Sequence, residues 1–328
     1  MSKLVTIYGG SGFVGRYIAR RMAHAGWRVR VAVRRPNEAL FVRTYGVVGQ
    51  VEPVLCNIRD DASVQRALQG AQAVINCVGT FDARGKNNFA AVQAEGAGRI
   101  ARLAAQEGVD RLVQISSIGA DADAKSEYSR TKAKGEAAVL AAFPSATILR
   151  PSVIFGTEDA FFNRFAGMSG LTPVLPVVGA DTRFQPVFVD DVAQAAEVAA
   201  TGAATPGVYE LGGPEAASFR DLMKKMLKVV QRRRLVLNIP FFAASAMAAI
   251  FDFLSMLTGG LVKNKILTRD QVKSLAVDNV VADGAKGFAD LGIKPVSMDA
   301  MLPEYLWRFR PSGQYAAIKD SAKNLRKV

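Results

Sequence analysis

The stretch Leu4-Val-Thr-Ile-Tyr8, followed by Gly9-Gly-Ser-Gly12-Phe-Val-Gly15, indicates the fold of this chain. Its apolar first half predicts a buried strand, and the spaced glycines predict a tight turn into a helix. Backbone N–H groups at the positive end of such a helix bind pyrophosphate. We therefore expect a dinucleotide here, held by the turn and the helix start: Gly9, Ser11, Gly12, Phe13, Val14, Gly15 and Arg16.

Residues 1–155 alternate strand-like and helix-like segments, the pattern of a parallel sheet covered by helices. The predicted strands are Leu4–Tyr8, Arg28–Val33, Val51–Leu55, Ala73–Val78, Arg111–Ser116 and Ala146–Leu149. The predicted helices are Phe13–Ala25, Ala62–Leu68, Phe89–Glu107 and Lys132–Ala142. This order predicts an α/β protein with a doubly wound parallel Rossmann sheet as its nucleotide-binding core.

Residues 156–307 have a different pattern and are expected to form a smaller, mixed C-terminal region interleaved with the core. It should contain short strands near Gln185–Phe188 and Gly207–Leu211 and helices near Asp191–Ala200 and Phe219–Val229. Residues 308–328 form a polar, basic tail, which is either frayed or ordered only on a partner.

Residues 239–262 form the longest apolar run of the sequence. Pro240, Asp252, Gly259 and Gly260 interrupt it, so no transmembrane span is expected. The alternatives are a helix packed in the protein core and a helix at a membrane or subunit interface.

The chain carries 42 Lys and Arg against 29 Asp and Glu, a formal net charge of +13. This excess favours an anionic partner, which could be a phosphorylated cofactor, nucleic acid, anionic lipid or an acidic protein, or it is simply a basic surface. Nucleic acid is not expected, because no aromatic-plus-basic stacking pattern or known binding module is present. The single His24 and two cysteines without CxxC spacing predict no metal site. Because the first strand follows Met1 almost directly, without a secretory signal, we expect the cytoplasmic side of any membrane.

The residues that follow the second strand predict the choice of nucleotide. Arg34 and Arg35 stand where an acidic residue would bind the ribose of NAD, and guanidinium groups bind phosphate instead. NADP(H) is therefore the expected cofactor. Asn57 and Ile58 should border the adenine, and Val78 and Gly79 the other side of the cofactor, unless both pairs merely end their strands.

A second group of residues indicates chemistry at the nicotinamide end. Tyr128 and Lys132 are four residues apart, so a helix places both side chains on one face. An ammonium group beside a phenol favours its ionised form and makes it a usable general acid or base. Ser117 ends the fifth strand, where its hydroxyl group can polarise a carbonyl.

Together these motifs resemble the extended or atypical short-chain dehydrogenase/reductase family. The resemblance rests on the glycine turn, Tyr128-x-x-x-Lys132 and Arg150-Pro-Ser-Val-Ile-Phe-Gly156, with Phe184–Asp191 and Tyr209–Gly213 extending it into the second half. It covers roughly residues 1–225 and implies a cofactor contact at Pro151.

Within this family the sequence is most similar to NADPH-binding accessory subunits of respiratory complex I (NADH:ubiquinone oxidoreductase) of mitochondria and related bacteria. The runs Ile7–Arg16, Tyr128–Glu136, Phe143–Ser152 and Ile154–Asn163 carry this likeness. It implies tightly bound NADPH, other complex I subunits as partners, and a role at the junction of the peripheral and membrane arms near the quinone site. The implied place is peripheral, on the cytoplasmic face of the inner membrane, which corresponds to the matrix face in mitochondria.

One departure from the family concerns catalysis. Ser117 and Tyr128 are 11 residues apart, about half the spacing usual in extended members. We therefore expect Tyr128 and Lys132 to hold the nicotinamide ribose while Ser117 lies out of reach of substrate, a vestigial catalytic set. The alternatives are an active NADP-dependent reductase or epimerase acting on a hydrophobic, quinone-precursor-like substrate, and a nucleotide-sensing regulator.

Overall fold

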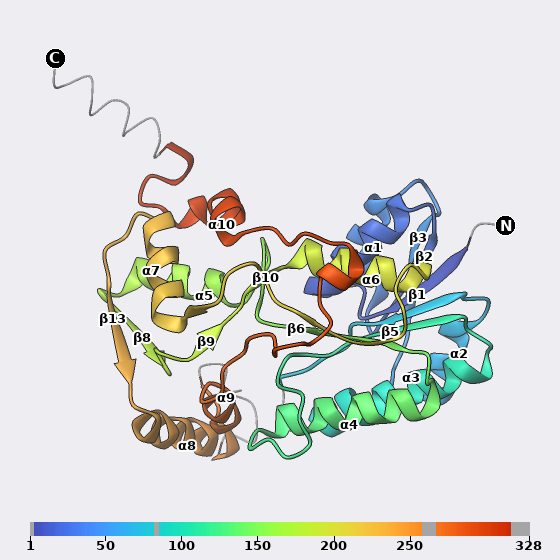
Figure 1. The fold of residues 1–328 in the computed structure, drawn as a ribbon, viewed down its shortest axis with the longest axis horizontal. Helices are drawn as coiled ribbons and strands as arrows, with labels where there is room; N and C mark the ends of the chain where they lie inside the picture. Colours follow the sequence, from blue (N-terminus) through green and yellow to red (C-terminus); the bar gives the residue numbers. More distant parts are fainter. Residues whose placement is uncertain (1–2, 82–84, 258–266, 316–328) are drawn as a thin grey trace. The chain divides into compact units, whose positions relative to one another are not determined.

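The computed structural model describes residues 3–81, 85–257 and 267–315, which fold into two compact units (Figure 1). The first unit comprises Met1–Ser152, Val189–Gly212 and Val281–Pro295. The second comprises Val153–Phe188, Gly213–Val280 and Val296–Val328. The chain therefore leaves the first unit and returns to it twice.

The first unit is built on a seven-stranded sheet with the order β11-β6-β5-β4-β1-β2-β3. All six strand pairings are parallel. The strands are β1 (Leu4–Tyr8), β2 (Arg28–Val33), β3 (Val51–Leu55), β4 (Ala73–Asn76), β5 (Arg111–Ile115), β6 (Thr147–Pro151) and β11 (Gly207–Leu211). The strand order reverses between β1 and β4, so the predicted doubly wound Rossmann sheet is confirmed, with β11 as a seventh strand.

Helices cover both faces of this sheet (Figure 1). They are α1 (Phe13–His24), η1 (Pro36–Tyr45), α2 (Asp61–Leu68), η2 (Ala90–Ala94), α3 (Glu95–Gln106), α4 (Glu127–Ala142), α6 (Val189–Thr201) and η3 (Ala289–Leu291). Helices α1 and α6 pack together, as do α3 and α4. Apolar side chains of α2, α3 and α4, among them Val64, Ile100 and Val139, form one buried cluster with the sheet.

Helix α4 begins at Glu127, five residues before the start predicted from the sequence. The Ser126 side chain caps it by accepting a hydrogen bond from the Ser129 N–H. The helix packs very close to the π-helix η2 at Gly135. A Cβ atom at this position would lie 2.1 Å from the Gln93 carbonyl oxygen, so only glycine allows the approach. The missing side chain of Gly135 thus sets the position of the helix that carries Tyr128 and Lys132.

Replacing Gly135 by Ala should destabilise the first unit. The new methyl group would meet main-chain atoms of Gln93, which cannot rotate away, and such overpacking costs about 1–3 kcal/mol. Urea unfolding followed by circular dichroism measures the change. The matched control is Gly79→Ala, since a Cβ atom there has no neighbour within 4 Å. Equal stability of the two variants would contradict the prediction.

The second unit contains three two-stranded sheets and several helices. Its strands are β7 (Ile154–Phe155), β8 (Val174–Val178), β9 (Arg183–Phe184), β10 (Val187–Phe188), β12 (Ala217–Ser218) and β13 (Leu235–Ile239). Its helices are α5 (Phe162–Leu171), α7 (Phe219–Val229), α8 (Phe241–Leu257), α9 (Arg269–Ser274), α10 (Met298–Leu306), η4 (Trp307–Phe309) and η5 (Gly313–Tyr315). Its core is rich in aromatic rings, with Phe155, Phe162 and Phe219 buried.

The apolar run 239–262 forms the end of β13 and helix α8, while residues 258–262 lie outside the described part. Among the described residues, no helix is both long enough and apolar enough to cross a membrane. Of the basic tail, residues 308–315 are described and lie in and around η4 and η5; residues 316–328 lie outside the described part.

Candidate functional site

The glycine turn joins β1 to α1 as a close main-chain crossing. Gly9 has a φ of +74°, and its N–H donates to the Ala32 carbonyl at 3.0 Å. The Gly12 N–H donates back to the Gly9 carbonyl at 2.9 Å. A Cβ atom at Gly15 would lie 2.4 Å from that carbonyl oxygen, so this position must be glycine.

The start of α1 is suited to an anion. Its first N–H groups, from Phe13 onward, have no carbonyl partner within the helix. No described side chain caps the helix, and its first turn holds no acidic residue. The Arg16 side chain donates to the carbonyl oxygens of Ser11 and Gly12, each at 3.3 Å, and thereby braces the turn. The predicted residues of the turn therefore come together around amide groups that no described side chain caps.

The two arginines after β2 are both exposed but differ in their contacts. The Arg35 guanidinium donates to Glu38 at 3.0 Å, in a pair exposed to solvent. Such pairs contribute little to stability. Arg34 forms no hydrogen bond or ion pair with the described residues. Arg34 can therefore bind a phosphate without first giving up a partner.

The loops after β3 and β4 lie at the same, carboxyl edge of the sheet as the glycine turn. The Asn57 Oδ1 accepts the Arg59 N–H, and the Ile58 carbonyl accepts from Arg99. The Val78 N–H donates to Asn76 Oδ1 at 3.0 Å, while the space around Gly79 is open. These contacts fix both loops and leave room beside Gly79.

Tyr128 and Lys132 lie on one face of α4, as predicted. Lys132 is buried, and its Nζ donates to the Ile115 carbonyl at 3.3 Å. The same Nζ lies 5.9 Å from the centroid of the Tyr128 ring. Phe81 stacks on this ring at 5.4 Å with an interplanar angle of 9°, and Phe89 meets it edge-on at 5.9 Å. The two phenylalanines cover the phenol ring, and sequence analysis did not single them out.

Ser117 has a buried Oγ atom that forms no hydrogen bond in the described part of the chain. A buried hydroxyl group without a partner costs free energy, and such groups are found where a ligand completes them. Together with the uncapped amides at the start of α1 and the open space at Gly79, this atom fits a nicotinamide nucleotide along the carboxyl edge of the sheet.

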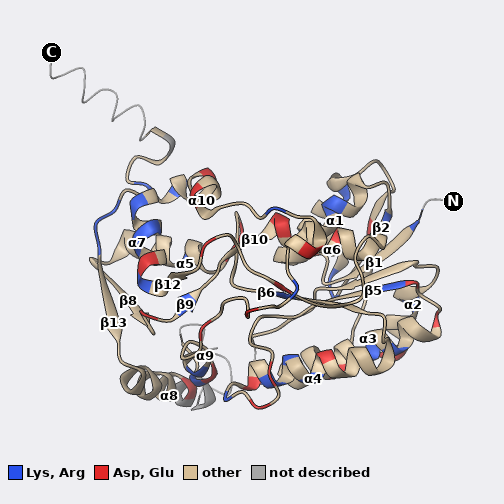
Figure 2. Cartoon of the chain, in the orientation of Figure 1, with Lys and Arg blue, Asp and Glu red and all other residues tan. Residues whose placement is uncertain are grey.

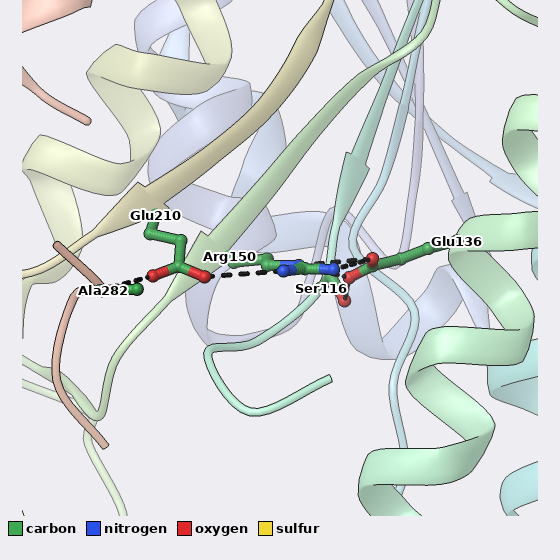
Figure 3. A network of polar contacts seen from close by, with 5 residues as sticks. All are labelled: Ser116, Glu136, Arg150, Glu210 and Ala282. Atoms are coloured by element: carbon green, nitrogen blue, oxygen red, sulfur yellow. Dashed lines mark hydrogen bonds and ion pairs between the residues drawn. The ribbon is translucent and has the colours of Figure 1, made fainter. Parts of the chain in front are cut away.

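A largely buried network of charges supports this edge (Figure 3). The Ser116 hydroxyl donates to the Glu136 carboxylate. The same carboxylate accepts hydrogen bonds from Nε and Nη2 of the Arg150 guanidinium group. Arg150 Nη1 reaches Glu210 at 3.4 Å, and Glu210 accepts the Ala282 N–H at 2.9 Å. The Glu136 carboxylate raises the pKa of Arg150 by hydrogen bonding. The network thus joins the ends of β5, β6 and β11 to α4.

Gln93 is a further residue that sequence analysis missed. It is buried in η2, and its Nε2 donates to the Thr80 carbonyl at 2.8 Å. Its Oε1 accepts the Thr131 hydroxyl at 3.0 Å. Gln93 therefore ties the loop after β4 to helix α4, a link between distant residues that no local pattern reveals.

Residues 5–212 match the model of the NAD dependent epimerase/dehydratase family. The chain belongs to this family. It is 34% identical to the mitochondrial NADH dehydrogenase (ubiquinone) 1 alpha subcomplex subunit 9 of Arabidopsis thaliana, over 94% of this chain and 79% of that protein. The mitochondrial 40 kDa subunit of NADH-ubiquinone oxidoreductase of Neurospora crassa is 30% identical, over 94% and 80%. The ceramide reductase of Caulobacter vibrioides is 32% identical, over 78% and 79%.

Solved structures of similar fold include the NADPH-dependent quinone oxidoreductase of Escherichia coli, determined with NADPH. Its TM-score is 0.70 at 18% identity, over 92% of this chain and 98% of that one. The crystal structure of gox2253 has a TM-score of 0.69 at 20% identity, over 95% and 99%. At these identities the likeness supports the Rossmann fold alone.

The charge network predicts how strongly different substitutions within it lower the free energy of unfolding. Arg150→Met would leave two carboxylates buried without their cation and should cost about 3–5 kcal/mol. Glu136→Gln leaves Arg150 paired with Glu210 and should cost less, about 1–3 kcal/mol. Urea unfolding measures both. The control is Glu52→Gln, which breaks the exposed pair with Arg43 and should cost at most ~1 kcal/mol. A larger loss for Glu136→Gln than for Arg150→Met would refute this account.

Proposed function

We propose that this protein is an NADP(H)-binding, non-catalytic accessory subunit of respiratory complex I. In this role it stabilises the junction of the peripheral and membrane arms near the quinone site. The observation that carries the proposal is the match over 94% of the chain to two relatives named as subunits of this enzyme. Its partners are other complex I subunits, and its place is peripheral, on the cytoplasmic face of the inner membrane.

The cofactor in this proposal is NADPH, bound tightly. The amides of Gly12 to Gly15 receive the pyrophosphate, and Arg34, with Arg35 beside it, receives the 2′-phosphate. The acidic group nearest to this pair in the sequence, Glu38, is already engaged by Arg35. A ribose with a free 2′-hydroxyl group, as in NAD, finds no carboxylate partner at the end of β2.

At the nicotinamide end of the cofactor, Tyr128 and Lys132 hold the ribose. Val78, Gly79 and Pro151 line the nicotinamide ring. The Phe81 ring lies flat on the face of the Tyr128 ring, which supports a holding role over a catalytic one. Residues 1–155 thus bind the nucleotide, while residues 156–307 and the basic tail 308–328 face partner subunits and anionic lipid, consistent with the net charge of +13.

A second function is favoured by a separate observation. Ser117 Oγ is buried and has no hydrogen-bond partner among the described residues, and the Tyr128–Lys132 pair is intact. A carbonyl reductase requires this set of side chains. A relative at 32% identity is named ceramide reductase. In this alternative the chain would reduce or epimerise a hydrophobic substrate. For reduction, NADPH would supply the hydride to the carbonyl carbon when bound, Tyr128 would donate the proton to the carbonyl oxygen, and Ser117 would hydrogen-bond that oxygen.

Charge reversal at the end of β2 should release the cofactor. We expect Arg34→Glu to lower NADPH retention more than Arg35→Glu, and the double variant to abolish it. Each lost charge-assisted contact is worth ~1.5–3 kcal/mol, roughly tenfold or more in affinity. The nucleotide released on denaturation is identified and quantified, with Arg43→Glu as an exposed control in the same segment. NADPH retained by the double variant, or NAD released from wild type, would overturn the assignment.

Association and turnover separate the two functions. Native membranes are solubilised gently, and the chain should migrate with NADH dehydrogenase activity while its NADPH stays unconsumed. Migration as a free oligomer would contradict the accessory role. The reductase alternative instead requires NADPH oxidation by the purified chain with hydrophobic carbonyl compounds, lost in Tyr128→Phe and Lys132→Met variants. Tyr128→Phe keeps the ring that stacks on Phe81 and removes only the hydroxyl group.

A further inference from the structure

Helix α8 in the second unit has the reverse of the usual arrangement of large and small side chains. Ala244 and Ala248 are fully buried, in a cluster with Val178 and Val272. Larger apolar side chains point away: Phe242 is 80% exposed, Ile250 59% and Met247 40%. At 3.6 residues per turn these three fall within an arc of about 140°, whose centre is turned well away from the alanines. A surface helix normally buries its large apolar residues.

The exposed side of α8, defined by Phe242, Met247 and Ile250, carries no charge. No acidic or basic residue occurs from Phe241 to Phe251, and Figure 2 shows no blue or red over this part of the helix. The one charged residue in the sequence of α8 is Asp252. Its carboxylate accepts a hydrogen bond from the main-chain N–H of Arg269. The strand that leads into the helix, β13, also exposes two large apolar residues, Leu235 and Leu237. An apolar surface of this kind is costly in water and indicates a binding surface.

Two cations lie on the helix that packs against the other side of α8. Helix α9 contacts α8 through the buried Val272 and exposes Arg269 and Lys273, with the less exposed Asp270 between them. A protein interface usually has a polar rim that forms hydrogen bonds with the partner. Lipid acyl chains form no hydrogen bonds, so an apolar surface is enough to bind them. Apolar side chains beside basic residues are the arrangement by which interfacial helices bind anionic membranes.

We propose that the exposed side of α8 inserts into the surface of a bilayer that contains anionic lipid. Phe242, Met247 and Ile250 enter the acyl boundary, and Arg269 and Lys273 lie at the level of the headgroups. This inference rests on the membrane association in the proposed function and names the surface responsible. The helix lies in the interface and does not cross it, in agreement with its length and its packing on Val178 and Val272.

Vesicle flotation of the full chain, with its nucleotide bound, tests the proposal. Phosphatidylcholine vesicles are compared with vesicles that also contain phosphatidylglycerol, and binding should be stronger to the anionic ones. Met247→Ser and Ile250→Ser should each lower the partition coefficient roughly tenfold, equivalent to ~1.4 kcal/mol. The control Val48→Ser removes a fully exposed apolar residue of the first unit and should bind as wild type does. Arg269→Gln with Lys273→Gln should remove the preference for anionic vesicles.

A conservative variant guards against loss of folding. Phe242→Trp places a fluorophore on the exposed side, and its emission should shift to shorter wavelength when vesicles are added. Bound protein without this shift would overturn the assignment to α8, as would absent binding to both kinds of vesicle. If vesicle binding fails while the chain still migrates with complex I, the accessory role stands and the lipid proposal does not. If the chain binds vesicles but migrates apart from complex I, the lipid proposal stands and the accessory role does not.

Discussion

The close approach of the main chain at Gly15 to the main chain at Gly9 is the constraint on which the first, nucleotide-binding unit depends. Helix α1 starts so close to the end of β1 that a single methyl group at Gly15 would collide with the Gly9 carbonyl. This approach leaves the first amides of α1 uncapped at the carboxyl edge of the sheet. The loops after β2, β3 and β4 meet the same edge because all the strands are parallel. One sterically required turn and these three loops therefore form one site.

Most of this half could be predicted from the sequence because its signals are local. The strand and helix periods, the glycine spacing and the i, i+4 pair Tyr128 and Lys132 each lie within a few residues. Six predicted strands and the strand at Gly207–Leu211 are all present in the sheet. The start of α4 was misplaced because the cap, Ser126, stands before polar residues without apolar periodicity.

Other features depend on contacts between distant residues and left no local signal. Gln93 reaches Thr80 and Thr131, and Glu136 reaches Ser116 and Arg150, across 13 to 38 residues of sequence. The strands β8 and β13 pair with each other alone, outside the main sheet, and neither was predicted. The exposure of Phe242 could not be read from hydropathy, which reports how apolar a segment is and not which side packs.

The hydrogen bond between Glu210 and the Ala282 amide has a consequence for folding during translation. It links the edge strand β11 to a segment that is synthesised 72 residues later. The sheet itself needs β11, which follows the whole stretch from Val153 to Phe188 that belongs to the second unit. A nascent chain halted before residue 207 therefore presents β6 as an open sheet edge. An open edge can pair with strands of other chains, so the nascent chain is exposed to such pairing until β11 has been synthesised.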